Sequence, residues 1–430
     1  MRKFWLSMTG GVAVLGFILG LSTARADEAT PQPTPAEKAP GSLSERVGQL
    51  EKKLASYEES SDQKFKQVQE DQLRLHFNLY GDAEYRVFGP AANFPLEDGF
   101  YLGQTDLHIM AQYGAHLSAM SEDVVEFDGQ EPSIDLERIV VFYTLSDQLR
   151  LGAGRDHTAF GYWNRTYHHG SQFQTTIDRP FFLAFEDGGG SDLPFKKSGV
   201  VPNHIVGAFA SGKFDLGSSS LGYELNVGNN GNIGLSVDPV TGAPVESSFN
   251  FDPEGDDFHS KRMAGRLVFK PDAGGGLALG LASVLNHYRV SADNAPADPS
   301  LAFSKLVQLL LEGEVIYTDE NFELLSEFYN FDDNLGDGDA VGSANNTAFY
   351  VQIGYQVTPD LKPYFRVENL NVDANDAFFK AMLYSNETVY LVGLRYDIVP
   401  VVSSLKLEAH FINANGANAT EVATAWGFGF

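Results

Sequence analysis

The feature that most constrains this chain is an alternation of apolar and polar residues that continues over more than ten positions. Between positions 74 and 87, apolar residues such as Phe77 and Leu79 alternate with polar residues such as His76 and Asn78. Successive side chains of a strand point to opposite faces, so each such segment has one apolar and one polar face. These segments exceed the usual ~5–6 residues of a soluble strand and suit a tilted membrane strand. The pattern recurs at 107–112, 262–270, 349–357, 390–398 and 405–411.

The first 26 residues are typical of an export signal. Arg2 and Lys3 precede an apolar stretch over 4–21, and Ala24-Arg25-Ala26 matches a cleavage pattern of small residues. An uncleaved membrane anchor is the alternative. No other stretch reaches the ~18 apolar residues that a membrane helix needs, so a mature membrane protein would have to be a β-barrel.

Two short segments separate the signal from the first alternating segment. Residues 27–42 contain four prolines among small and charged residues and are predicted to be an extended linker. Residues 43–72 carry apolar positions at steps of four and three, which predicts a periplasmic α-helical coiled coil. An amphipathic helix lying on the barrel mouth is the alternative. The predicted seam consists of Leu43, Val47, Leu50, Leu54 and Tyr57.

The connections after residue 73 alternate between short and long, as in outer-membrane barrels with tight periplasmic turns and longer outer loops. Counting seven short and eight long connections predicts sixteen strands. The expected fold is therefore all-β, a transmembrane antiparallel barrel over 73–430. The expected long connections include 157–199, 332–345 and 413–420.

The final strand ends on an aromatic residue. Trp426, Phe428 and Phe430 alternate with Gly427 and Gly429. This strand resembles the C-terminal strand of bacterial outer-membrane proteins, which implies recognition by the barrel assembly machinery. The final strand should pair with the strand that begins near residue 74.

The chain as a whole resembles the Gram-negative porin superfamily, in particular trimeric porins with an N-terminal coiled coil and the architecture of phosphate-selective porins. The stretch 151–155, Leu-Gly-Ala-Gly-Arg, followed by Phe160-Gly161-Tyr162, looks like the start of their third loop. The resemblance implies a homotrimer in the outer membrane, in contact with lipid and lipopolysaccharide. No ladder of lysines is evident in the sequence, so phosphate selectivity is not expected.

In sixteen-stranded porins the third outer loop folds inward and narrows the pore, which the resemblance implies for 157–199. The alternative is a surface loop that covers the mouth. Charged side chains there should line water or pair with each other, because unpaired burial is costly. The candidate constriction residues are Arg155, Asp156, Arg165, His168, His169, Asp178, Arg179, Glu186 and Asp187.

The polar faces of the strands supply eight basic and nine acidic candidates for the pore wall, which predicts no strong ion selectivity from the wall itself. The acidic loops would favour cations at the mouth, and the net charge of −27 argues against a nucleic-acid partner. The basic candidates are Arg74, Arg86, Arg150, Arg262, Arg266, Arg366, Arg395 and Lys406. The acidic candidates are Asp82, Glu84, Glu312, Glu314, Glu323, Glu327, Glu368, Asp397 and Glu408.

Sites for catalysis or metal binding are weakly indicated. His168-His169 could bind zinc but lacks a third ligand at a fixed spacing. The acidic loops around Asp252 and Asp332 could bind Ca²⁺, although solvated loops are the simpler interpretation. No G-x-S-x-G motif and no cysteine occur. We therefore expect no enzyme, cofactor or metal site.

The predicted function is passive diffusion of small hydrophilic solutes or ions. A tethering barrel that binds a periplasmic partner through its coiled coil, and a substrate-specific uptake channel, for a metal among others, are the alternatives.

Overall fold

The structure is a computed structural model that describes residues 72–89, 98–127, 132–167, 173–183, 199–235, 248–250, 253, 255, 260–273, 275–292, 299–336 and 342–430. The chain divides into one unit over 1–65 and a second over 66–430, and all described residues belong to the second. The predicted signal (1–26), the linker (27–42) and all but the last residue of the predicted coiled coil (43–72) lie outside the described residues.

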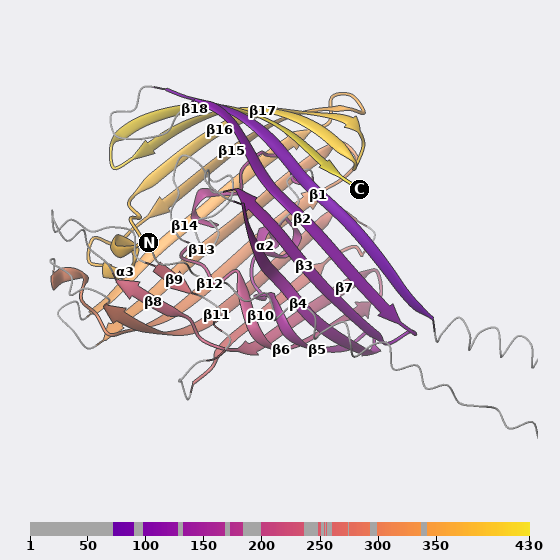
Figure 1. The fold of residues 1–430 in the computed structure, drawn as a ribbon, viewed down its shortest axis with the longest axis horizontal. Helices are drawn as coiled ribbons and strands as arrows, with labels where there is room; N and C mark the ends of the chain where they lie inside the picture. The colour runs from indigo at the N-terminus through magenta and orange to yellow at the C-terminus, as the bar shows by residue number, and fades with distance from the viewer. Residues whose placement is uncertain are drawn as a thin grey trace, which may run out of the picture. The chain divides into compact units, whose positions relative to one another are not determined.

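Sixteen of the described strands form one closed antiparallel wall (Figure 1). The first seven are β1 (Leu73–Phe88), β2 (Gly99–Tyr113), β3 (Leu117–Phe127), β4 (Pro132–Ser146), β5 (Leu149–His157), β6 (His204–Leu216) and β7 (Ser219–Gly228). The other nine are β10 (Arg262–Lys270), β11 (Leu277–Ala292), β12 (Lys305–Thr318), β13 (Phe322–Gly336), β14 (Gly342–Tyr355), β15 (Leu361–Asn371), β16 (Glu387–Val399), β17 (Ser403–Ala414) and β18 (Ala417–Gly429).

The barrel closes between β1 and β18, which confirms the predicted pairing of the last strand with the first. The register runs from Tyr80 opposite Gly429 to Phe88 opposite Glu421. The backbone of Phe430 exchanges two hydrogen bonds with Leu79, at 2.8 and 2.9 Å. The predicted sixteen-stranded antiparallel barrel is thereby confirmed for the described residues.

Several short elements lie in the long connections. The hairpin of β8 (Asn232–Leu235) and β9 (Ser248–Asn250) lies between β7 and β10. β8 pairs in parallel with the last four residues of β11, Arg289 to Ala292. The pairing of β10 with β11 reaches only to Leu285, so β8 replaces β10 as the neighbour of β11 at this end of the strand. The helical elements are α2 (Tyr162–Thr166), η2 (Phe181–Leu183), η3 (Pro299–Leu301) and α3 (Ala377–Ala381).

Two connections expected to be long are shorter in the structure. β13 continues to Gly336 and β14 starts at Gly342, so Asp332 and Asp333 belong to a strand rather than a loop. β17 and β18 are joined by Asn415 and Gly416 alone, with φ of 50° and 80°. Asn-Gly is the preferred sequence of a two-residue hairpin turn because both positions need positive φ. The expectation overlooked this turn chemistry.

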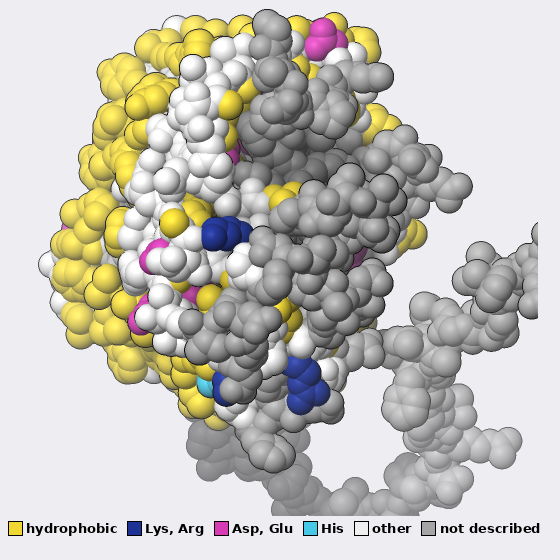
Figure 2. Space-filling view, turned by 90° about the vertical axis from the view of Figure 1, so that its left-hand side faces the viewer, with side chains coloured by type: hydrophobic (Ala, Val, Ile, Leu, Met, Phe, Trp, Pro, Cys, Tyr) yellow, Lys and Arg dark blue, Asp and Glu magenta, His cyan; other side chains and the backbone are white. Residues whose placement is uncertain are grey.

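The outer face of the wall is apolar. Phe77, Leu281 and Trp426 are 60%, 69% and 56% exposed, whereas alternate positions on the same strands are polar or buried. Figure 2 shows hydrophobic side chains over much of the described outer surface, with few charged ones among them. Within the described ranges, no helix is long and apolar enough to cross a membrane. The apolar outer surface and charged inner surface of the strands suit a wall that faces lipid outside.

Candidate functional site

The candidate site is the interior of the barrel, where inward-facing charged side chains meet the connection between β5 and β6. Of the candidate wall residues, Arg74 is exposed, and Asp82, Arg150 and Asp397 are partly buried. The other candidate wall residues are buried, namely Glu84, Arg86, Arg262, Arg266, Glu312, Glu314, Glu323, Glu327, Arg366, Glu368, Arg395, Lys406 and Glu408.

Residues 173–183 of the β5–β6 connection, here called the inner segment, lie against the inner face of the strands from β13 through β18. Strand carboxylates accept hydrogen bonds from backbone N–H groups of the inner segment. Glu408 accepts from Ile177, and Glu368 accepts from Phe181, both at 2.7 Å. The inner segment lacks a β ladder of its own, so these side chains supply partners that buried backbone groups require.

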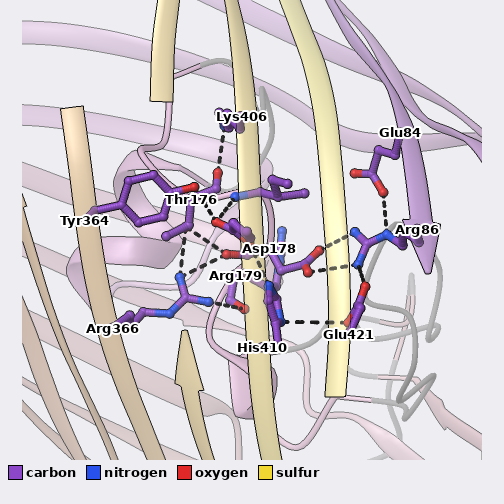
Figure 3. A network of polar contacts seen from close by, with 12 residues as sticks. Glu84, Arg86, Thr176, Asp178, Arg179, Tyr364, Arg366, Lys406, His410 and Glu421 are labelled. Atoms are coloured by element: carbon purple, nitrogen blue, oxygen red, sulfur yellow. Dashed lines mark hydrogen bonds and ion pairs between the residues drawn. The ribbon is translucent and has the colours of Figure 1, made fainter. Parts of the chain in front are cut away.

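Strand cations bind the backbone carbonyls of the same segment (Figure 3). Lys406 donates to Thr176 O and Arg395 donates to Gln174 O, each at 2.7 Å. Arg366 donates to the carbonyls of Asp178 and Arg179 at 2.9 and 3.1 Å, and to the Thr176 hydroxyl at 2.9 Å. Five candidate wall residues therefore hold the inner segment in place: Arg366, Glu368, Arg395, Lys406 and Glu408.

Arg86 joins the inner segment to β1 and β18. Its guanidinium is fully buried and forms ion pairs with Glu84 at 2.7 Å, Asp178 at 2.7 Å and Glu421 at 2.5 Å. Asp178, Glu408 and His410 lie close enough together to share a metal ion. Asp178 already pairs with Arg86, and Glu408 accepts from Ile177, Tyr364 and His410. This group therefore serves as an ion-pair network.

The start of the β5–β6 connection is fixed to β13. Gly161 has φ of 62° and precedes α2. The Glu327 carboxylate accepts hydrogen bonds from the backbone N–H groups of Tyr162 and Trp163, which would otherwise lack partners at the start of a helix. Burial raises the pKa of the Tyr162 and Tyr167 hydroxyls, so both remain protonated.

A cavity of about 480 Å³ lies on the inner side of β1 to β7. It adjoins a second cavity of about 870 Å³, which reaches the turns after β4, β10 and β12. Arg150, Arg165, Ser211 and Glu224 line both cavities. The charged residues of the smaller cavity are Arg74, Arg138, Arg150, Asp156, Arg165 and Glu224.

The cations of the smaller cavity differ in their partners. Arg165 pairs with Glu224 at 2.7 Å and lies 3.9 Å from Asp156. Arg150 lies 3.6 Å over the ring of Phe142. Among the described residues, neither Arg74 nor Arg150 has an ion pair. Both residues line the smaller cavity.

The remaining candidate residues lie apart from these groups. Arg155 is 3.7 Å from both Asp135 and Glu137. Arg262 donates to His204 O at 2.8 Å, and Arg179 donates to Leu183 O at 3.1 Å within the inner segment. His168, His169, Glu186 and Asp187 lie outside the described residues.

An apolar cluster fills the barrel on the side of the long connections of β12 to β15. Tyr329, Phe331 and Tyr350 point inward and are fully buried. They belong to the same apolar cluster as Phe378 and Phe379 of α3. The sequence expectation placed only polar residues on this inner face. The available signal was the run 306–311, Leu-Val-Gln-Leu-Leu-Leu, which is apolar on both faces.

Comparison with known proteins supports the fold. The sequence matches no protein-family model and no curated protein. Among solved structures, the anion-selective porin from Comamonas acidovorans is 12% identical, with a TM-score of 0.55 over 84% of this chain and 100% of that chain. The trimer form of in-vitro folded OmpT, an outer membrane protein of Vibrio cholerae, is 10% identical, with a TM-score of 0.52 over 84% and 100%. The outer membrane channel DcaP of Acinetobacter baumannii is 12% identical, with a TM-score of 0.50 over 84% and 97%. The described barrel therefore has the fold of the outer-membrane porins.

Proposed function

We propose that this chain forms an outer-membrane channel through which small hydrophilic solutes or ions diffuse passively, without enzymatic activity. The observation that carries the proposal is the pair of adjoining cavities inside the wall, lined by residues of β1 to β7 and β10 to β12 with charged side chains among them. A charged inner surface inside a wall with an apolar outer surface is what a solute path through lipid requires.

In this proposal the connection over 157–199 narrows the path. The inner segment occupies the side of β13 to β18, where its backbone bonds to Glu368, Lys406 and Glu408. Solutes then pass on the opposite side, between the inner segment and the wall of β1 to β7. The apolar cluster at β12 to β15 restricts the path further, because a dry, packed core does not conduct ions.

Single-channel conductance in a planar bilayer tests the route. Ser211 lines both cavities, so we expect Ser211→Trp to reduce the conductance to roughly half or less, because a side chain of this size fills much of the narrow space. Ala208 lies on the same strand and is exposed on the outer face, so Ala208→Trp is the matched control and should conduct like the wild type.

Two results would count against the proposal. A refolded wild-type barrel that opens no ohmic channel would exclude diffusion. Equal conductance in Ser211→Trp and the wild type would place the current outside these cavities.

We also propose that the chain is inserted by the barrel assembly machinery, contacts lipopolysaccharide and forms a homotrimer. Support for assembly comes from the last strand, where Trp426 and Phe430 are 56% and 74% exposed on the outer side and available to a recognising partner. Support for the trimer is the predicted coiled-coil seam.

A further inference from the structure

Three glutamates converge on the inner face where β12 and β13 meet the start of the β5–β6 connection. Glu312 and Glu314 belong to β12 and Glu327 to β13, and one carboxylate oxygen from each lies within 4.8 Å of the others. Glu314 is directly opposite Glu327 in the strand register. Like charges at such a position destabilise a sheet unless something lies between them.

Nearby cations do not balance these carboxylates. Arg266 pairs with Glu314 at 2.6 Å and with Glu224 at 3.0 Å. Arg165 pairs with Glu224 at 2.7 Å. Counted over the described residues, these four carboxylates share two guanidinium groups, which leaves two negative charges. Uncompensated charge in a buried site is costly and calls for a counter-ion or protons.

Glu312 has no ion pair among the described residues. The residue is 4% exposed, and within the part of the chain that the structure describes neither carboxylate oxygen has a hydrogen-bond partner of good geometry, although the Gly161 N–H lies nearby. The Tyr329 hydroxyl, also buried, adjoins the group: a Cβ at Gly161 would lie 2.7 Å from that hydroxyl and 2.9 Å from the Glu327 carboxylate. Carboxylate oxygens of three glutamates and the hydroxyl of one tyrosine thus lie close to Gly161.

We infer that Glu312, Glu314 and Glu327 bind a hard divalent cation, Ca²⁺ in the first place. Ca²⁺ takes six to eight oxygen ligands at about 2.3–2.6 Å in flexible geometry, and these carboxylates can approach a common ion at such distances. The ion balances the two excess charges. It also ties β12 and β13 to Tyr162 and Trp163, whose N–H groups bond to Glu327. Glu314 and Tyr162 line the 870 Å³ cavity, which gives the ion a route to the site. This inference does not depend on the proposed channel.

Tb³⁺ luminescence tests the site in the refolded full-length barrel after treatment with a chelator. Tb³⁺ replaces Ca²⁺ at oxygen sites and emits when a nearby tryptophan is excited, and Trp163 adjoins Glu327. We expect tryptophan-sensitised emission that Ca²⁺ displaces and that Trp163→Phe abolishes. Trp426→Phe removes a tryptophan on the outer face and should leave the emission unchanged.

Ca²⁺ titration calorimetry supplies the second test. Glu312→Gln should lose one binding site or weaken it by about tenfold or more, because the ligand charge sets the affinity of such sites. Asp215→Asn removes the same charge from an exposed residue that lines neither cavity and should bind like the wild type. Ca²⁺ binding by acidic loops is the same in the wild type and both variants. A difference in Ca²⁺ binding between the proteins therefore reports on this site alone.

Two results would overturn the inference. The first is identical Ca²⁺ binding by Glu312→Gln and the wild type. The second is a wild-type barrel that gives no sensitised Tb³⁺ emission and unfolds at the same temperature in millimolar Ca²⁺ as in EDTA. This result would show that protons, and not a cation, neutralise the carboxylates. The second measurement needs only the wild type, so it decides the matter even if Glu312→Gln does not fold.

Discussion

Inward-facing arginines of this barrel differ in function according to their partners. Arg86 and Arg366 are buried. Arg86 forms ion pairs with carboxylates, and Arg366 donates hydrogen bonds to backbone carbonyls of the inner segment. Arg150 packs over Phe142 and faces both cavities. Ion selectivity should therefore depend on arginines such as Arg150, which line the cavities without an ion pair among the described residues, because the field of a paired charge is largely cancelled by its partner.

Replacing Arg150 tests this distinction. Four arginines and two carboxylates line the smaller cavity, so we expect the wild type to prefer anions despite the acidic chain. Arg150→Gln should lower the ratio of Cl⁻ to K⁺ permeability by a factor of roughly two to five, since a unit charge about 4 Å from an ion in water contributes about 1 kcal/mol. The zero-current potential across a KCl gradient measures the ratio.

Lys380→Gln is the control for Arg150→Gln, because it removes one positive charge from an exposed position on α3. Its permeability ratio should match that of the wild type. A cation-selective wild type, or an equal shift in both variants, would show that the outer charge of the protein and not the cavity sets the selectivity.

At the scale of elements, the inner segment is held by side chains of the wall. Between residues 173 and 180 it has no helix or strand, so its buried N–H and C=O groups depend on Glu368, Glu408, Arg366, Arg395 and Lys406. Removing one of these partners leaves backbone groups buried without hydrogen bonds, which costs about 1–3 kcal/mol for each group.

Arg366 is the most informative position to change, because it donates three hydrogen bonds to the inner segment and also pairs with Glu368 at 2.7 Å. Arg366→Gln should lower the free energy for opening the segment by about 3–5 kcal/mol, the usual cost of breaking a buried pair. Hydrogen exchange of the amides in 174–183 measures this opening and should accelerate strongly.

The same exchange measurement on Lys380→Gln should reproduce the wild-type rates. Unchanged exchange in Arg366→Gln would mean that packing, rather than this guanidinium, holds the segment. Faster exchange throughout the barrel would indicate global loss of stability, so amides of β3, far from Arg366 in the wall, serve as the internal reference.

The sequence predicts the wall of this barrel better than its contents. Alternation defines each strand locally, and the terminal aromatic residue locates the closing strand, so the strand number and the pairing of β18 with β1 were predictable. The partner of each inward charge depends on the strand register and on contacts between residues far apart in the sequence, such as Arg86 and Asp178, which are 92 positions apart. Periodicity alone cannot supply such contacts.

The glutamate group shows the same limit. Glu312, Glu314 and Glu327 were recognisable as inward-facing residues of neighbouring strands. Their convergence depends on the register that places Glu314 opposite Glu327, and on Gly161 approaching from the β5–β6 connection. Once the register is known, a pair of like charges opposite each other is itself a signal for a bound cation.

For the whole molecule, the polar interior and apolar exterior reverse the usual arrangement of a soluble protein. The apolar cluster over β12 to β15 is an exception inside the wall. The two cavities lie beside β1 to β7, β10 and β12 and near the short turns. The conducting area of one barrel should consequently be small for a wall of sixteen described strands.

Assembly of several such barrels should depend on the predicted coiled coil. A helix with an apolar seam at Leu43, Val47, Leu50, Leu54 and Tyr57 cannot cover that seam alone, so association buries it. Leu50→Asn with Leu54→Asn should dissociate the proposed homotrimer, since each buried leucine contributes about 1.5–3 kcal/mol. Light scattering of the detergent-solubilised protein gives the mass of the assembly.

Lys52→Gln with Lys53→Gln is the control, because it changes two residues outside the seam and should leave a trimer. A leucine double variant that remains trimeric would assign the association to the barrel surfaces, and a monomeric wild type would exclude the trimer.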